Sequence, residues 1–388
     1  MRLSFAFSFF YLICFLGCKN PKPKSHAEKE HVLKETINDS TSSRLKRFAE
    51  SAESIDKYFS RQHKRTQFYG NILFADHGDI IFEKAYGYKK RKKDPEITID
   101  QTYQLASVTK VFTAVATLML YEQGKINLND AVKKYIPEFP YNDWNITIHH
   151  LLSHRSGLGK YTHFCDNPKT VWEEKDCSIY NDDVIKIMAE IEPNLAKTPG
   201  KKFYYTNTNY ILLASIIERV SGMKYRKFVQ KYIFEPLEMN STKVYYRDNE
   251  GELIKPVKGY EANFRPALDI YLNGCEGDKG IYSNVHDMLK FDQALYDEKL
   301  IRKETLELAM LGYSKPNKWK SDMNYGYGFR MINHPKTKEK IVYHTGWWRG
   351  FRSYFVRRIK KQQTIVILTN VKRGQFLKVA DLVDFLPE

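Results

Sequence analysis

Apolar residues follow two different repeats along this chain, and the change between them predicts how the fold is organised. Near both ends, short apolar or alternating runs bounded by turn residues are typical of β-strands. Between the ends, apolar residues recur at helical spacing, punctuated by glycine and proline. We expect strands at residues 69–75, 80–86, 340–344, 351–358 and 364–369. We expect helices at residues 43–65, 148–153, 182–191, 209–220, 227–233 and 375–385, and one that begins at residue 107.

The order of these segments indicates an α/β fold of the α+β kind. Strands from opposite ends of the chain can pair in one antiparallel sheet, and helices can then flank it. The helical middle is expected to be inserted as a second lobe. We therefore predict a sheet lobe formed by residues 46–104 and 325–388, and a mostly helical lobe formed by residues 105–324.

Residues 1–17 have the pattern of a secretory signal peptide. Arg2 precedes the almost wholly apolar residues 3–17, a run shorter than the roughly 20 residues that a membrane span needs. The run ends at Leu16-Gly17-Cys18, which resembles the bacterial lipobox, in which the cysteine receives a lipid. We therefore expect export to the cell envelope of a bacterium and membrane attachment through lipidated Cys18. An ordinary cleaved signal followed by an incidental cysteine is the alternative.

Residues 18–45 are expected to form the lipid anchor and a flexible tether. This segment is rich in Lys, Glu, Ser, Pro and Asn and has few large apolar residues, so it offers little surface to bury. Residues 46–388 are expected to form the folded domain.

Composition and charge bear on the choice of partner. The chain has 388 residues, 42% of them hydrophobic, and a formal net charge of +16. Such a charge would suit an anionic partner such as nucleic acid, a membrane or a wall polymer. Its lysines and arginines are scattered, however, and no zinc-finger, RNA-binding or basic-helix pattern occurs. We expect no nucleic-acid partner and interpret the charge as that of a solvated surface.

The cysteines leave one disulfide to consider. Cys14 is lost with the signal peptide, and Cys18 is the expected lipidation site. In an oxidising compartment Cys165 and Cys177 could form a disulfide that closes a short loop, with two free thiols as the alternative. Cys275 would then be unpaired.

Ser107-Val-Thr-Lys110 is the strongest candidate for chemistry. Residues three positions apart lie one turn apart on one face of a helix. A lysine in that position can accept the serine proton, and the serine can then form an acyl-enzyme. The same S-x-x-K spacing occurs at residues 43–46, 54–57 and 221–224, but only Ser107 opens a strongly apolar helix.

Two further motifs follow in order, Tyr205-Thr-Asn207 and His344-Thr-Gly346. Together with Ser107 and Lys110 they resemble the S-x-x-K, Y-x-N and [KH]-T-G series of penicillin-recognising serine hydrolases. The resemblance is closest to the class C β-lactamase, D-alanyl-D-alanine carboxypeptidase and esterase branch. It covers residues 43–385 and implies a β-lactamase/transpeptidase-like fold.

The resemblance implies a role for each motif residue. Ser107 would be the nucleophile, and Lys110 would accept its proton. Tyr205, polarised by neighbouring cations, would shuttle protons to and from the leaving group. Asn207 would contact the substrate amide or hold Lys110. His344 would contribute a hydrogen bond, with or without a charge, beside Tyr205.

The third motif implies the rest of the site. The oxyanion hole would be formed by the backbone N–H groups of Ser107 and Trp347. Gly346 must be small so that the strand edge can approach the substrate. Two tryptophans here are bulkier than the residues of many relatives. They could form an aromatic wall, narrow the cleft or simply pack, and these alternatives leave the choice of substrate open. The expected substrate-binding residues are Thr345, Gly346, Trp348 and Arg349.

Each catalytic candidate also has a structural interpretation. Ser107 could be a helix N-terminal residue, Tyr205 a packing aromatic, Asn207 a turn residue, and His344 a strand histidine with satisfied hydrogen bonds. Arg349 could recognise a substrate carboxylate or could merely cap a turn.

The histidines at positions 149, 150 and 154 resemble a metal cluster at first sight. No acidic or cysteine partner stands at ligand spacing from them. We expect no metal and no organic cofactor.

These features predict a serine hydrolase that cleaves an amide or ester through a Ser107 acyl-enzyme. Its substrate would be a small molecule or a peptide, a wall peptide among them. Because His344 replaces the third-motif lysine, carboxypeptidase or esterase activity is favoured over antibiotic hydrolysis. The alternative is a non-catalytic, lipid-anchored, penicillin-binding-like receptor of the cell envelope.

Overall fold

A computed structural model describes residues 26–89, 95–166, 178–246, 253–313, 323–374 and 376–388. The chain divides into two units, residues 1–47 and residues 48–388. Within the first unit the described residues are helical and belong to α1 (His26–Thr66), which continues into the second. Among the described residues, no helix combines the length and the apolar character needed to cross a membrane.

The expected flexible tether is helical from His26 onward, which corrects the prediction for residues 26–45. The segment has neither proline nor glycine between residues 24 and 66, so nothing in the backbone interrupts a helix. Glu30 and Lys34 also stand four residues apart, a spacing that supports helices. The signal peptide and Cys18 lie outside the described residues.

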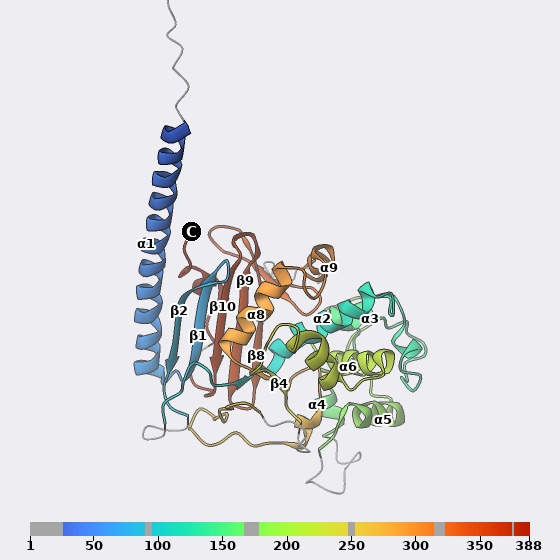
Figure 1. The fold of residues 1–388 in the computed structure, drawn as a ribbon. Helices are drawn as coiled ribbons and strands as arrows, with labels where there is room; N and C mark the ends of the chain where they lie inside the picture. The colour runs from blue at the N-terminus through green and yellow to red at the C-terminus, as the bar shows by residue number, and fades with distance from the viewer. Residues whose placement is uncertain (1–25, 90–94, 167–177, 247–252, 314–322, 375) are drawn as a thin grey trace, which may run out of the picture. The chain divides into compact units, whose positions relative to one another are not determined.

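The domain is built on a seven-stranded antiparallel sheet in the order β2-β1-β10-β9-β8-β7-β6 (Figure 1). β1 pairs with β10 from Gly70 opposite Thr369 to Asp76 opposite Gln363, so the two ends of the domain meet in the middle of the sheet. This confirms the predicted sheet of terminal segments. Its strands are β1 (Gly70–Asp76), β2 (Asp79–Tyr86), β6 (Met323–Tyr325), β7 (Arg330–Asn333), β8 (Lys340–Trp348), β9 (Phe351–Arg358) and β10 (Gln363–Thr369).

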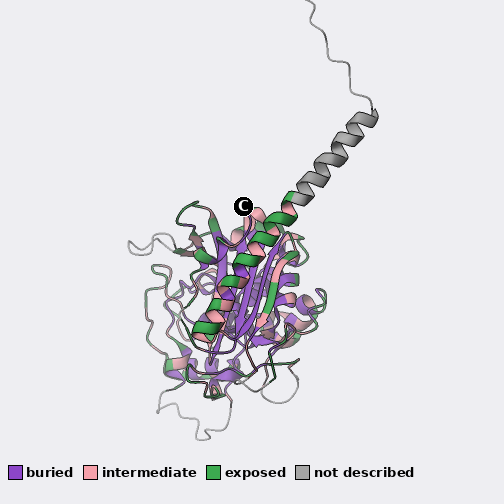
Figure 2. Cartoon of the chain, turned by 90° about the vertical axis from the view of Figure 1, so that its left-hand side faces the viewer, coloured by how far each residue is buried: buried purple, intermediate pink, exposed green. Residues whose placement is uncertain are grey.

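Both faces of the sheet are covered by helices. Alternate residues of β1 enter two different cores: Ile72 and Phe74 pack with α1 residues such as Phe59, whereas Leu73 packs in the larger core on the other face. The short helix α10 (Val379–Val383) joins the first of these cores. Figure 2 shows the buried strands behind α1, whose outward face is exposed.

The helical lobe is formed by residues between β2 and β6. α2 contacts α6, and α6 also contacts α3, α5 and α7, so α6 is central to the lobe. A small sheet in the order β3-β5-β4 lies beside the start of α2. The elements are β3 (Tyr103–Gln104), α2 (Thr109–Glu122), α3 (Ile148–Leu152), α4 (Tyr161–Phe164), α5 (Asn181–Ile191), α6 (Thr208–Ser221), α7 (Tyr225–Val229), the π-helical turn η4 (Gln230–Phe234), β4 (Lys243–Val244), β5 (Ile281–Ser283) and α9 (Lys303–Ala309).

The expected boundary of the helical lobe is wrong for α8 (Val285–Tyr296), which packs against β1 and β10 of the large sheet (Figure 1). Asp292 of α8 explains this position, because it forms a fully buried ion pair with Arg357 of β9 and accepts a hydrogen bond from Thr364 of β10. A buried carboxylate requires such partners, which are found on the sheet.

Candidate active site

Ser107 lies on η1 (Ala106–Val108), a single 3-10 turn that leads into α2. Two strands hold this turn: the Leu105 N–H donates to the Ile281 carbonyl of β5 at 2.8 Å, and Ser353 Oγ of β9 donates to the Leu105 carbonyl. Ala106 has a φ of +49°, a left-handed conformation that costs an L-residue about 1–2 kcal/mol. The strained turn therefore presents Ser107, which is partly exposed, from an otherwise buried segment.

Lys110 occupies the first turn of α2 and is fully buried. Its Nζ lies 3.1 Å from Ser107 Oγ and donates to the backbone carbonyl of Asp278 at 2.8 Å. The S-x-x-K spacing thus places the ammonium nitrogen within hydrogen-bond distance of the serine oxygen. This contact is the geometry of an activated nucleophile.

Tyr205 stands in the loop before α6, and its ring lies beside two cations. Lys110 Nζ is 5.3 Å and Arg330 Cζ is 4.7 Å from the ring centroid. Burial raises the pKa of Tyr205, but the charges of Lys110 and Arg330 and the proximity of Ser107 outweigh burial and lower it below its usual value. Within the described residues the buried phenol oxygen has no well-aligned hydrogen-bond partner. Tyr205 is therefore suited to moving a proton.

Arg330 is the site residue that the sequence did not reveal. It begins β7, lines the cleft, and is oriented toward Tyr205 and Tyr325, with its Cζ 5.6 Å from the Tyr325 ring. The expectation that Tyr205 needs neighbouring cations was the only signal for it. Nothing in the spacing of the chain singles out this arginine from the many others.

The surroundings of His344 favour its neutral form over its charged form. Burial, together with the charges of Arg330 and Lys110, holds the pKa of His344 well below its usual value. Its Nδ1–H donates to the Thr345 carbonyl at 2.9 Å, and its Nε2 accepts from the Tyr325 hydroxyl at 3.2 Å. His344 therefore has an orienting role, and Arg330 supplies the charge.

Gly346 lies where β8 meets the turn that carries Ser107. A Cβ at this position would stand 2.2 Å from the Leu105 carbonyl oxygen and 3.0 Å from the Ser107 nitrogen. Pairing of β8 with β7 ends at Tyr343, so residues 344–348 are not covered by β7. This arrangement leaves space for a substrate beside the backbone of Trp347. The oxyanion hole formed by Ser107 and Trp347 remains a prediction.

Asn207 is the N-cap residue of α6 and makes no capping hydrogen bond through its side chain. Its Oδ1 is buried and has no partner among the described residues. Asn207 also lines the cleft. These features fit a side-chain amide that remains available to a substrate better than they fit a residue that only stabilises a turn.

Ser107, Tyr205 and Asn207 line one cleft of about 460 Å³, whereas Lys110 and His344 are fully buried and are not among its described lining residues. No aspartate or glutamate is among the described residues that line it, whereas Arg330 and Lys160 are. Thr345, Gly346, Trp347 and Trp348 line it as predicted. The sequence did not single out five further lining residues: Lys160, Thr162, His163, Thr206 and Phe376.

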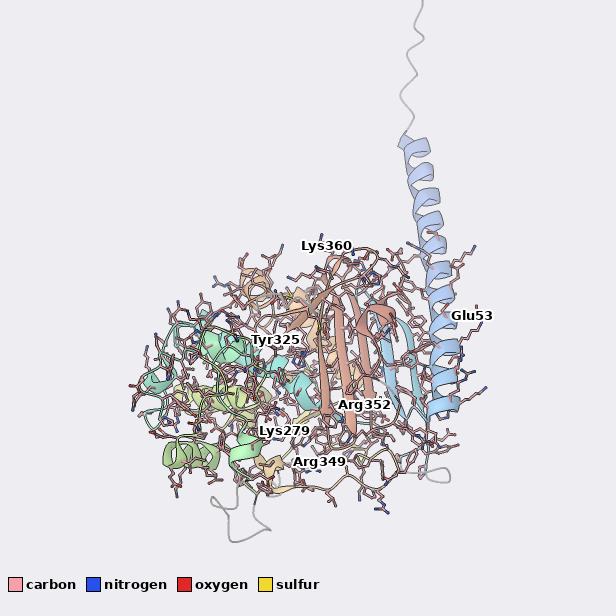
Figure 3. The ribbon with its side chains drawn as sticks, turned by 180° about the vertical axis from the view of Figure 1, so that it is seen from behind. Glu53, Lys279, Tyr325, Arg349, Arg352 and Lys360 are labelled. Atoms are coloured by element: carbon pink, nitrogen blue, oxygen red, sulfur yellow. The ribbon has the colours of Figure 1, made fainter. Side chains whose placement is uncertain are left out.

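Arg349 lies on the turn between β8 and β9 and is not among the residues that line the cleft (Figure 3). Trp348 pairs with Phe351, so Arg349 and Gly350 form a two-residue hairpin turn with φ of +42° and +88°. Positive φ at both positions is typical of a type I′ turn. The turn interpretation therefore fits Arg349, and the cleft guanidinium is that of Arg330.

The remaining candidates concern thiols and metals. Cys165 is a buried free thiol, and Cys177 lies outside the described residues, so the disulfide stays a prediction. His149 hydrogen-bonds the Tyr327 hydroxyl through Nδ1, and His150 completes a capping box with Thr147. Over the described ranges, no group of three or more His, Cys, Asp or Glu residues is arranged to hold a metal ion.

Comparisons with known proteins identify the family and the fold. Residues 55–386 match the Beta-lactamase family. Penicillin-binding protein 4* of Bacillus subtilis (strain 168) is 32% identical over 334 residues, which cover 81% of this chain and 71% of that protein. The octameric penicillin-binding protein homologue from Pyrococcus abyssi has a TM-score of 0.70 at 26% identity, covering 82% of this chain and 73% of its own. The D-amino acid amidase from Ochrobactrum anthropi SV3 shares the fold, with a TM-score of 0.68 at 20% identity, over 87% and 97% of the two chains.

Replacing Arg330 with Gln should raise the pKa of Tyr205. A nearby cation favours the phenolate, so losing it should shift the Tyr205 titration to higher pH by about one unit. Ultraviolet difference titration of each protein against its Tyr205→Phe counterpart isolates this phenol. The control is Arg349→Gln, which removes an equal charge outside the cleft. Unchanged titration in Arg330→Gln would contradict the assignment.

Proposed function

This chain belongs to the beta-lactamase family, whose members are serine hydrolases, and we propose that it cleaves an amide or ester through an acyl-enzyme at Ser107. The observation that carries the proposal is the contact of 3.1 Å between the buried Lys110 Nζ and Ser107 Oγ. Tyr205, with its lowered pKa, lies next to this pair. A nucleophile, a buried lysine and a tyrosine suited to proton transfer therefore lie together beside one cleft.

The proposed reaction has two steps. Ser107 Oγ attacks the substrate carbonyl carbon while its proton passes to the Tyr205 phenolate, which the positive charge of Lys110 stabilises, and the backbone N–H groups of Ser107 and Trp347 stabilise the oxyanion. Tyr205 then returns a proton to the departing amine or alcohol, which leaves an ester on Ser107. Water hydrolyses this ester, releases the acid and restores the serine hydroxyl.

The cleft favours a substrate that carries negative charge. Arg330 and Lys160 line it without any acidic residue among the described lining residues. Arg330 is partly buried beside Tyr205, and a guanidinium binds a carboxylate with two parallel hydrogen bonds. We propose an amide or ester that bears a carboxylate, such as the terminus of a wall peptide. The Bacillus subtilis relative, named a penicillin-binding protein, supports this substrate class, because penicillin is an amide that bears a carboxylate.

We also propose that the protein is exported and held at a membrane of the bacterial envelope by a lipid on Cys18. The support is the sequence alone: an apolar run of signal-peptide length that ends in Leu16-Gly17-Cys18. A lipid anchor would keep the cleft near envelope substrates.

Ser107→Ala should abolish the adduct that a fluorophosphonate forms, and Lys110→Met should slow it by about 10³-fold or more, because the two groups act as one unit. Intact-mass analysis measures the adduct. Ser221→Ala and Lys224→Met, at another S-x-x-K site, are matched controls: Ser221 donates to the Ile217 carbonyl at 2.6 Å and should remain unlabelled. An adduct that persists in Ser107→Ala would refute the nucleophile. Acylation without turnover of any ester or amide would favour the receptor alternative.

Arg330→Met should lower kcat/KM for a D-alanyl-D-alanine peptide about tenfold more than for a neutral nitrophenyl ester. Loss of Arg330 weakens catalysis on both substrates through Tyr205, but only the peptide also loses a carboxylate partner. Steady-state kinetics on the two substrates gives the ratio. Arg349→Met should leave the ratio unchanged. Equal losses on both substrates in Arg330→Met would remove the argument for a carboxylate.

Cys18→Ser should move the expressed protein from the detergent phase to the aqueous phase in a detergent-partitioning experiment, because the lipid would be lost. Ser107→Ala, which leaves Cys18 in place, is the control and should stay in the detergent phase. Recovery of the wild-type protein in the aqueous phase would reject the lipid anchor.

A further inference from the structure

A buried charge pair next to the cleft has no part in the reaction described above. Asp278 and Lys279 are 0% and 2% exposed, and Lys279 Nζ lies 3.3 Å from Asp278 Oδ1. Tyr161, also fully buried, connects them: its hydroxyl accepts from Lys279 Nζ at 2.6 Å and donates to Asp278 Oδ2 at 3.2 Å. The three side chains form a closed triangle, in which burial and Asp278 hold the pKa of Tyr161 well above its usual value, so the phenol keeps its proton.

The triangle contacts the site at two points. The backbone carbonyl of Asp278 accepts the hydrogen bond from Lys110 Nζ at 2.8 Å. On the other side, Lys279 Nζ lies 5.1 Å from the ring centroid of Trp348, which lines the cleft. Trp348 is also held through its Nε1, which donates to Asn273 Oδ1 at 2.8 Å. Figure 3 shows Lys279 in the same region as the β8–β9 turn that carries Arg349.

Stability alone does not account for a buried pair at this position. A buried ion pair contributes little net stability compared with apolar residues of the same volume, because both ions lose their hydration. Asp278 and Lys279 stand between Gly277 and Gly280, which have φ of +95° and +99°, and glycines leave a backbone more conformational freedom than other residues do. The side-chain contacts of Asp278 and Lys279 fix the direction of the Asp278 carbonyl, which accepts the hydrogen bond from Lys110.

We propose that Tyr161, Asp278 and Lys279 are positioning residues of the acyl-transfer reaction, a role that rests on the proposed function. They hold the Asp278 carbonyl in line with Lys110 Nζ, and they hold the ring of Trp348 against the cleft. The carbonyl sets where the ammonium nitrogen stands relative to Ser107 Oγ. A displacement of about 1 Å in such a group reduces the rate by about a hundredfold.

The test compares Tyr161→Phe and the double variant Asp278→Asn/Lys279→Met with wild type. The double variant removes both charges together, so neither is left buried alone. Each protein is acylated by a fluorophosphonate over a range of concentrations, which separates the rate constant at saturation from the half-saturating concentration, and its melting temperature is recorded.

Tyr161→Phe should lower the rate constant about tenfold at an unchanged half-saturating concentration. The double variant should lower it about a hundredfold and raise the half-saturating concentration, because Trp348 also loses its cation.

Tyr86→Phe is a matched control, because Tyr86 and Lys84 both contact the Asp56 carboxylate, at 3.0 and 2.7 Å, outside the cleft. It should change the melting temperature and leave the acylation rate constant at the wild-type value. Folded Tyr161→Phe and double variants that are acylated at wild-type rates would overturn the positioning role alone. Absence of any adduct on wild-type Ser107 would instead overturn the proposed function.

Discussion

The site depends on one buried ammonium group that has no carboxylate beside it. Among the described residues, Lys110 contacts a hydroxyl, a backbone carbonyl and the faces of Tyr205 and Tyr210, but it forms no ion pair. Neutral dipoles and rings stabilise the charge without cancelling its field at a distance. The field therefore reaches Tyr205 and His344, whose pKa values it lowers. A carboxylate beside Lys110 would stabilise the lysine charge, but it would also cancel the field that lowers the pKa of Tyr205.

Charge and orientation come from different residues in this cleft. Arg330 supplies a second positive charge, whereas His344 is a neutral hydrogen-bonding group held by Tyr325 and the Thr345 carbonyl. A charged His344 beside Lys110 and Arg330 would be a third cation in a buried space, which burial and repulsion oppose. Because Arg330 supplies the charge, a histidine can occupy the position that a lysine holds in related motifs.

The parts of the structure that could be predicted are those encoded locally. Ser107 and Lys110 meet because one helical turn separates them, and the terminal strands are evident from their own apolar runs. Arg330 could not be predicted, because β7 has four residues and reaches the site only through its pairing with Tyr343 of β8. The position of α8 was missed for a similar reason: an apolar face specifies that a helix is buried, and a distant partner such as Arg357 specifies where.

The pairing of β1 with β10 has a consequence for how the chain acquires its fold. Gly70 finds its partner only when Thr369 has been synthesised, so the centre of the sheet cannot close before then. Contacts between such distant segments make folding slow, since a long loop must be closed before they form. A ribosome extends a chain by about 5–20 residues per second, so the N-terminal hairpin waits many seconds with an open edge. During that interval the cleft cannot form, because Arg330 of β7 and Thr345 of β8 belong to its lining.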